Sequence, residues 1–230
     1  MCVALAAYHS WQEVLEYYDL QPGMQSVKSN PDRDLKAKPS AVIRPNAVHP
    51  FMRQTTDGRF LDLAIWGFPS SKGRITPVTV ARCETLDVLP MFRDAFQTRR
   101  CVVPVSGYFE WKREVEGTRA PWKFSRQNGV SVPDFIALAG LYMLNQTTKQ
   151  SHFVVVTTEP NEVTAEIYGR MPVILKEEGI QTWLSPDSDP ADLRNICKPY
   201  DGNDLVIEPV SKTLFDRPKA IDKNQLSLAI

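Results

Sequence analysis

Apolar residues recur at helical spacing in several short stretches of the chain. Positions 11, 14, 15 and 18 are apolar, and Ser10 with Glu13 forms a capping box, so the pattern predicts an amphipathic helix over residues 11–19. Helices are also expected in three later segments: residues 86–99 after Pro90, residues 176–184, and the segment that starts at Asp189-Pro190.

Alternating or continuous apolar runs predict strands through most of the remaining chain. Leu61, Leu63 and Ile65 alternate with polar or small residues, which is typical of a strand over 60–66. Further strands are expected at residues 101–105, 107–112, 134–143, 152–158 and 205–210, and a polar loop at 24–40. This order favours an α+β fold: one domain over residues 1–230, with a curved, barrel-like, mostly antiparallel β-sheet flanked by a few helices.

Composition agrees with a folded core and excludes some classes of protein. Hydrophobic residues make up 43% of the 230 residues, and 18 prolines against 11 glycines indicate many turns and short elements. No apolar run is long enough to span a membrane, and the first residues lack the basic start of a signal peptide, so we expect a cytoplasmic protein.

Metal, cofactor and disulfide chemistry are not expected. The cysteines are far apart in sequence and the histidines do not have ligand spacing, so we expect no zinc site, no cofactor and, in a reducing compartment, no disulfide framework. The residues concerned are Cys2, Cys83, Cys101 and Cys197, with His9, His49 and His152.

The net charge is zero, but it is unevenly distributed. Residues 72–126 contain eleven Lys or Arg and six Asp or Glu, whereas residues 159–208 contain four basic and eleven acidic residues. The basic half could attract a polyanion. Charge alone favours the simpler interpretation, in which folding mixes both signs over one surface.

Cys2 is the first candidate for chemistry. Removal of Met1 would leave a free amine beside a thiol, and such a 1,2-aminothiol closes a stable thiazolidine ring with an aldehyde. The alternative is a small buried apolar residue, which is the more common role of a lone cysteine at this position.

Glu110 lies among aromatic residues in the segment 107–112. If it is desolvated there, its pKa rises towards neutrality, which suits general acid–base catalysis. The alternative is a strand whose glutamate points to solvent or pairs with Lys112 or Arg113.

Two arginines and a tryptophan are candidates for nucleic-acid contacts. Arg82 and Arg170 could each grip a phosphate, and Trp66 could stack on an unpaired base. The alternatives are a salt bridge of Arg82 to Glu84 or Asp87, a structural Arg170, and a core position for Trp66.

In combination these segments resemble the SRAP family, the SOS response-associated peptidases that process abasic sites. The segments that match, in order, are Met1-Cys2, Arg44-Pro45-Asn46, Trp66-Gly67, Ala81–Thr85, Met91-Phe92, Arg100–Pro104, Gly107–Lys112, Val156–Thr158, Arg170–Leu175 and Pro209–Ser211. They extend over nearly the whole chain, and Cys2 followed by the Gly-x-Phe-Glu-Trp segment is the specific part.

The resemblance implies a function in the DNA damage response. A single-stranded DNA enters a basic cleft of a monomeric protein, and the aldehyde of an abasic site forms a covalent thiazolidine link to Cys2. The resemblance assigns acid–base catalysis to Glu110 and assistance with the sugar chemistry to Tyr168. It assigns DNA contacts to Asn46, Trp66, Arg82, Thr157 and Arg170.

Three positions depart from the family pattern. Ala4 stands where the family has an arginine, Val80 where it has an asparagine, and Tyr168 where it has a histidine, although His49 or His9 could substitute for the latter. Two alternatives therefore stay open beside the enzyme-like crosslinking function. One is a non-covalent DNA-binding module that kept the fold, and the other is a cysteine hydrolase or autopeptidase.

Overall fold

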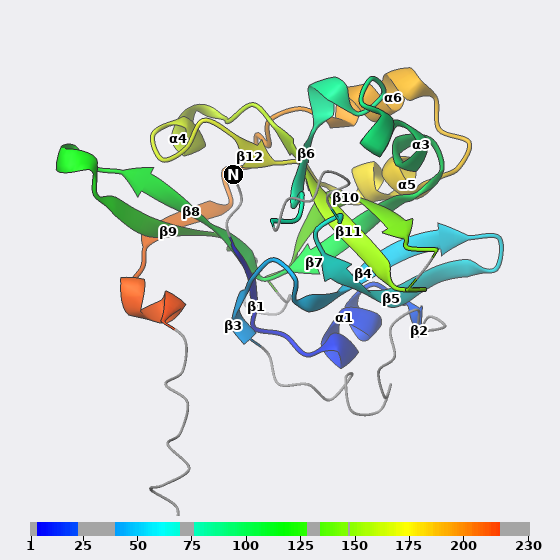
Figure 1. Cartoon of the computed structure of the whole chain (residues 1–230), viewed down its shortest axis with the longest axis horizontal. Helices are drawn as coiled ribbons and strands as arrows, with labels where there is room; N and C mark the ends of the chain where they lie inside the picture. Colours follow the sequence, from blue (N-terminus) through cyan, green and yellow to red (C-terminus); the bar gives the residue numbers. More distant parts are fainter. Residues whose placement is uncertain (1–3, 23–39, 70–75, 128–133, 147, 217–230) are drawn as a thin grey trace, which may run out of the picture.

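The computed structural model of the chain describes residues 4–22, 40–69, 76–127, 134–146 and 148–216. Strands dominate these residues and form two sheets, with helices on the outside (Figure 1). The described helices are too short or too polar to cross a membrane.

The larger sheet closes almost completely into a ring. Its order is β12-β11-β10-β7-β4-β5-β2, and a parallel pairing of β11 with β5 through His152↔Ile65 and Phe153↔Trp66 brings the sheet back on itself. β6 and β13 add to β11 and β10. The strands are β2 (Gln21–Pro22), β4 (Val48–Thr55), β5 (Gly58–Trp66), β6 (Val80–Arg82), β7 (Arg100–Val105), β10 (Ile136–Leu144), β11 (Ser151–Thr158), β12 (Met171–Pro172) and β13 (Ile174–Leu175).

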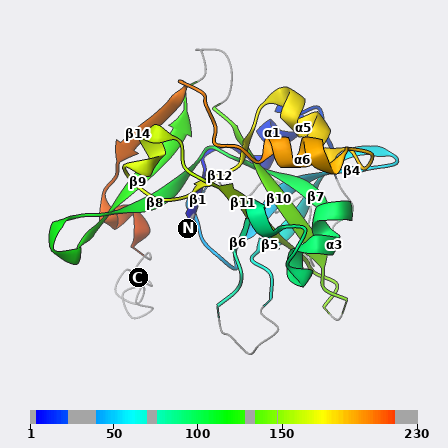
Figure 2. The ribbon, with the colours of Figure 1, turned by 90° about the horizontal axis from the view of Figure 1, so that it is seen from above.

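The smaller sheet is antiparallel and lies beside the ring (Figure 2). Its order is β14 (Leu205–Pro209), β9 (Arg119–Arg126), β8 (Gly107–Arg113), β1 (Ala4–Ala7) and β3 (Ser40–Ile43). The β8–β9 hairpin turns through the 3₁₀ helix η2 (Val115–Gly117) and extends away from the body of the molecule (Figure 1).

Five α-helices occur in the described part of the chain. α3, α5 and α6 gather on one side of the ring, while α1 lies on the other (Figure 1). The helices are α1 (Trp11–Tyr17), α3 (Pro90–Thr98), α4 (Glu162–Ala165), α5 (Glu177–Leu184) and α6 (Pro190–Ile196), with 3₁₀ helices η1 (Cys83–Thr85) and η3 (Lys212–Phe215). The Ser10–Glu13 capping box and the Asp189 N-cap are both formed.

A buried arginine attaches the helical layer to the ring. The Arg100 guanidinium donates hydrogen bonds to carbonyl oxygens at the end of α3 and around the end of α5, namely those of Phe96, Gln97, Trp183 and Ser185. These carbonyls at the helix ends have no partner within their own helix, so the buried charge is satisfied by groups that need a donor. Arg100 is therefore structural.

The sequence predictions of fold class and of most elements are confirmed. The fold is α+β with mostly antiparallel sheets, and the expected barrel-like curvature is a nearly closed ring of strands. Several elements were missed, among them the strands β1, β3, β4 and β9 and the short helix α4. The predicted loop at 24–40 lies outside the described residues apart from Ser40, which begins β3.

Candidate functional site

Glu110 is the most deeply buried carboxylate in the smaller sheet. It lies in the middle of β8, is 1% exposed, and faces Trp122 of β9 across the strand pair. Burial raises the pKa of Glu110 to about 8, because removing the carboxylate from water penalises its charged form. The environment therefore favours a protonated carboxyl at neutral pH, as a general acid requires.

β1 lies along the same segment of β8. Ala4 pairs with Phe109, Leu5 with Tyr108 and Ala6 with Gly107. The described start of the chain therefore lies opposite the residue that precedes Glu110. Cys2 itself lies outside the described residues.

Gly107 allows this close packing of strands. A Cβ at this position would sit 2.5 Å from the backbone carbonyl oxygen of Phe124, on the neighbouring strand β9. Only glycine lets β8 and β9 approach this closely there, and the same pairing places Glu110 opposite Trp122.

Arg170 and Arg82 approach the end of β11 from different elements. Arg170 donates two hydrogen bonds to the Glu84 carboxylate, at 2.6 and 2.9 Å, and one of 2.8 Å to the Thr157 carbonyl oxygen. The hydrogen bond from Arg170 lowers the pKa of Glu84. Arg82 pairs with Thr157 through β6 and β11, and its side chain is exposed.

These contacts bear on the alternatives for Arg82. Glu84 is engaged by Arg170 and Asp87 by Arg194, so Arg82 makes no ion pair with a described residue. Its guanidinium is thus available to an anionic ligand, while that of Arg170 is positioned by Glu84.

Of the other predicted DNA contacts, Asn46 is exposed and Thr157 is buried. Asn46 adopts a left-handed backbone with φ of 70°, which asparagine tolerates, and its N–H donates to the Trp66 carbonyl oxygen. The Thr157 hydroxyl donates to the carbonyl oxygen of Ala81, at 3.4 Å.

Trp66 occupies a core position. Its side chain is 0% exposed, its ring stacks parallel to Phe153, and its indole N–H donates to the Thr79 carbonyl oxygen at 3.0 Å. The exposed face needed for stacking on a base is therefore absent, and the ring instead supports the closure of β5 onto β11.

The three departures from the family pattern lie on different elements: Ala4 in β1, Val80 in β6 and Tyr168 after α4. Tyr168 is half-buried after α4, and its backbone N–H donates to the Thr164 carbonyl oxygen. Val80 packs against the apolar cluster that contains Phe153 and Val155.

The two histidines that could substitute at the site have other partners. His49 Nε2 lies 2.9 Å from the carbonyl oxygen of Pro104, and burial lowers the pKa of His49 to about 4. His9 packs against Phe135 near α1. Neither contact joins these rings to Glu110.

Sequence reasoning missed the aromatic partner of Glu110. Trp122 pairs with Glu110 across the two strands, and the Lys112 ammonium lies 5.4 Å from the centre of the Trp122 ring. Trp122 and Lys123 directly follow Pro121, and a proline within a run argues against a strand. The segment was therefore not predicted to be a strand.

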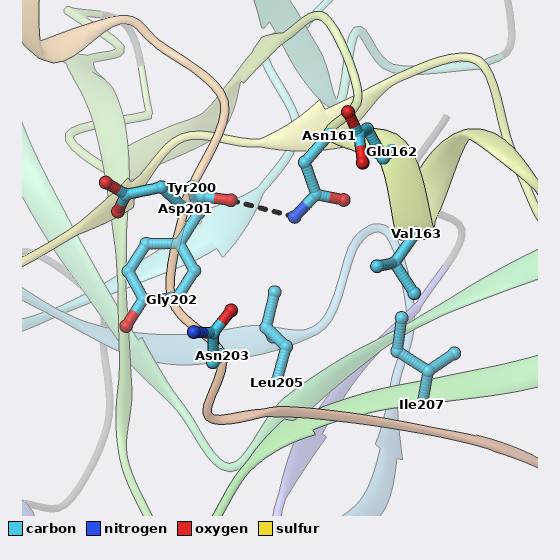
Figure 3. Close-up of a pocket in the computed structure, with 9 residues that line it drawn as sticks. All are labelled: Asn161, Glu162, Val163, Tyr200, Asp201, Gly202, Asn203, Leu205 and Ile207. Carbon is cyan, nitrogen blue, oxygen red and sulfur yellow. Dashed lines mark hydrogen bonds between the residues drawn. The ribbon is translucent and has the colours of Figure 1, made fainter.

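A separate open pocket of about 410 Å³ lies between α4 and β14 (Figure 3). Val163, Leu205 and Ile207 supply apolar side chains, and Asn161 donates a hydrogen bond to the Tyr200 carbonyl oxygen at its rim (Figure 3). It adjoins the sheet that contains Glu110, because Pro209 at the end of β14 pairs with Trp122. Within the described residues, no three His, Cys, Asp or Glu side chains gather as a metal site.

The sequence is similar to proteins that are named for abasic site processing. The chain is 36% identical over 143 residues to the abasic site processing protein YoqW of Bacillus subtilis, which is 60% of this chain and 62% of that protein. It is 24% identical over 191 residues to the abasic site processing protein YedK of Escherichia coli, 80% of this chain and 84% of the relative. The chain thus spans less than two thirds of the length of YoqW.

Solved structures share the fold at low sequence identity. A protein from Bacteroides thetaiotaomicron superposes with a TM-score of 0.77 and 22% identity, over 94% of this chain and 95% of that one. A protein from Bordetella bronchiseptica gives a TM-score of 0.72 with 20% identity, over 91% and 100%.

A family model extends over almost the whole sequence. It matches residues 1–216 and is described as SOS response associated peptidase (SRAP). The chain belongs to the SRAP family.

Proposed function

We propose that this protein captures abasic sites in single-stranded DNA by a covalent thiazolidine link to Cys2. The protein acts as a monomer in the response to DNA damage. Glu110 serves as the acid–base catalyst, and the arginine surface at the end of β11, which consists of Arg82 and Arg170, receives the DNA backbone. Relatives named for abasic site processing support this assignment of substrate.

The observation on which the proposal rests is the burial of Glu110 beside the start of β1. Ala4 pairs with Phe109, the residue that precedes Glu110, and Cys2 stands two residues before Ala4 in the sequence, a chain length of at most about 7 Å. Removal of Met1 would bring a free amine and a thiol into that neighbourhood.

The chemistry balances with the loss of one water molecule. The Cys2 amine adds to the aldehyde carbon of the ring-opened sugar, and the Glu110 carboxyl gives a proton to the departing hydroxyl group. The thiol then adds to the resulting imine carbon and gives up its proton, which returns to the Glu110 carboxylate. A pKa of about 8 keeps Glu110 protonated for the first step at neutral pH.

DNA binding is proposed to use both exposed and positioned groups. Arg82 offers a guanidinium that forms no ion pair with any described residue, and Arg170 is held beside it by Glu84 and Thr157. Asn46 is exposed at a turn that the Trp66 carbonyl fixes, so Trp66 contributes through its backbone. Tyr168 is proposed to assist the sugar chemistry as a hydrogen-bond donor.

The second candidate is a non-covalent DNA-binding module. Val80 favours it, because a side chain packed in the apolar cluster offers no hydrogen bond where the family has an asparagine. A general cysteine peptidase is less well supported, since the rings of His49 and His152 engage backbone carbonyl oxygens. Removal of the protein's own Met1 is the peptidase activity that fits.

Denaturing electrophoresis distinguishes these functions. Protein whose Met1 removal is confirmed by mass is incubated with single-stranded DNA that contains one abasic site, and then heated. The crosslinking proposal predicts a heat-resistant adduct that Cys2→Ala abolishes, while DNA binding persists in that variant. Binding without any adduct in the processed wild type would establish the non-covalent module instead.

A further inference from the structure

Two cysteines from distant parts of the sequence meet near the end of β11. Cys83 begins η1, and Cys197 is the residue that ends α6. The Cys83 sulfur lies 3.8 Å from the carbonyl oxygen of Cys197, so the two residues are in direct contact. Both residues are partly exposed, so small solutes have access to them.

The surroundings shift the pKa values of the two thiols in opposite directions. The Thr158 hydroxyl donates to the Cys197 carbonyl oxygen at 3.0 Å, and it also contacts Cys83. The hydrogen bond from Cys197, followed by that from Thr158, lowers the pKa of Cys83 to about 7, while Glu84 opposes and Arg170 favours the thiolate. The same thiol contact, together with burial, raises the pKa of Cys197.

We propose that Cys83 and Cys197 form an oxidisable dithiol, in which Cys83 attacks a peroxide and Cys197 resolves the product as a disulfide. This modification site is independent of the DNA chemistry at Cys2. It rests on the contact of the Cys83 thiol with the Cys197 backbone, which brings two free, partly exposed cysteines together where η1 meets the end of α6.

The reaction balances in two steps. The Cys83 thiolate attacks one oxygen of hydrogen peroxide, the O–O bond breaks, and hydroxide leaves, which gives a sulfenic acid on Cys83. The Cys197 sulfur then attacks the Cys83 sulfur and displaces the oxygen, which leaves as water with the Cys197 proton. The two thiols lose two electrons, and the peroxide accepts them.

The disulfide would connect η1 to the end of α6, next to the arginine surface. Arg82 directly precedes Cys83, and Glu84, which directly follows it, positions Arg170. Cys101 provides an internal comparison, because it is fully buried and its pKa is raised well above the ordinary value.

Peptide mapping by mass spectrometry tests the proposal in the full chain with a Cys2→Ala background, so that the N-terminal thiol does not react. Brief treatment with hydrogen peroxide at neutral pH should link the peptides of Cys83 and Cys197 with the loss of two hydrogens, reversibly with dithiothreitol. Cys101 should stay reduced.

Two serine variants separate the roles of the two sulfurs. Cys197→Ser should accumulate a dimedone-reactive sulfenic acid on Cys83, because the resolving thiol is gone. In Cys83→Ser, Cys197 should react at least about tenfold more slowly than Cys83 does in Cys197→Ser. Sulfinic acid on Cys83 of the background protein without a disulfide, or modification of Cys101 at the same rate, would overturn the proposal.

Discussion

Burial determines the protonation of Glu110. The carboxyl lies in the middle of β8, opposite an indole ring, and its pKa of about 8 is well above the ordinary value of 4.5. A glutamate with this pKa is protonated in the folded protein at a pH where the same side chain is ionised in the unfolded chain. Its catalytic suitability is therefore linked to a cost in stability.

Replacement of Glu110 by glutamine should change how stability depends on pH. Between pH 4.5 and about 8 the folded state holds a proton that the unfolded state releases, so this group contributes stability at low pH that is lost as pH rises. Glutamine has no such proton. In thermal scans, the melting temperature of Glu110→Gln minus that of the wild type should therefore increase from pH 5 to pH 8.

A constant difference in melting temperature across this pH range would contradict the raised pKa. His49 does not obscure the comparison, because both proteins contain it. Its own pKa, lowered to about 4 by burial, affects the stability of both equally.

At the scale of elements, the register of β8 between β1 and β9 is the critical feature. Gly107 pairs with Ala6 on one side and approaches the Phe124 carbonyl on the other, so the strands on both sides depend on this one position. A substitution that displaces β8 at Gly107 should therefore displace both the start of β1 and Glu110.

Gly107→Ala should destabilise the protein by about 1–3 kcal/mol, because the new methyl group meets backbone rather than a side chain that can move. Chemical denaturation measures the loss. Gly179→Ala is the matched control, since its methyl group would only contact Leu175 at ordinary distances within α5. That variant should be neutral or more stable; equal destabilisation of both would contradict the role of Gly107.

The end of β6 should contribute a salt-dependent contact with DNA. Arg82→Ala should weaken binding of single-stranded DNA and reduce the slope of log affinity against log salt by about 0.7, the value expected for one phosphate contact. Fluorescence anisotropy at several salt concentrations measures both quantities.

Lys149→Asn is the matched control for Arg82. It removes one charge from the turn before β11, roughly 25 Å from the opposite end of that strand, and asparagine tolerates the left-handed backbone of this residue. The salt slope should not change in this variant. Identical slopes for Arg82→Ala and Lys149→Asn would exclude a specific contact at Arg82.

The sequence predicted the elements whose side-chain pattern reports burial directly. The alternation in β5 and the continuous apolar runs of β7, β10 and β11 indicated strands, and the capping box indicated the start of α1. β9 was missed because Pro121 and several charged residues interrupt its pattern, although its neighbours supply the pairing that stabilises it.

Contacts between residues that are far apart in the sequence could not be predicted from the sequence pattern. Glu84 was an expected partner of Arg82, two residues away, but it pairs with Arg170, which is 86 residues distant. Trp66 was a candidate for base stacking, but its side chain is buried. Whether a residue at the end of a strand is buried or exposed depends here on the pairing of β5 with β11, which the sequence pattern does not show. Asn46, Thr157 and Tyr168 came from the family resemblance alone, whereas the other site residues were also indicated by their chemistry and sequence context.

At the scale of the whole molecule, the proposed reaction uses a buried acid, the start of the chain and the arginine surface together. The most direct test identifies the linked atoms. Processed protein is reacted with abasic single-stranded DNA, digested, and mapped by mass spectrometry, with Glu110→Gln compared for rate. We expect the DNA remnant on the peptide that begins at Cys2, with the loss of one water, and a rate about 10²–10⁴-fold lower in Glu110→Gln. A remnant on a lysine or on another cysteine, or an unchanged rate in Glu110→Gln, would contradict the mechanism.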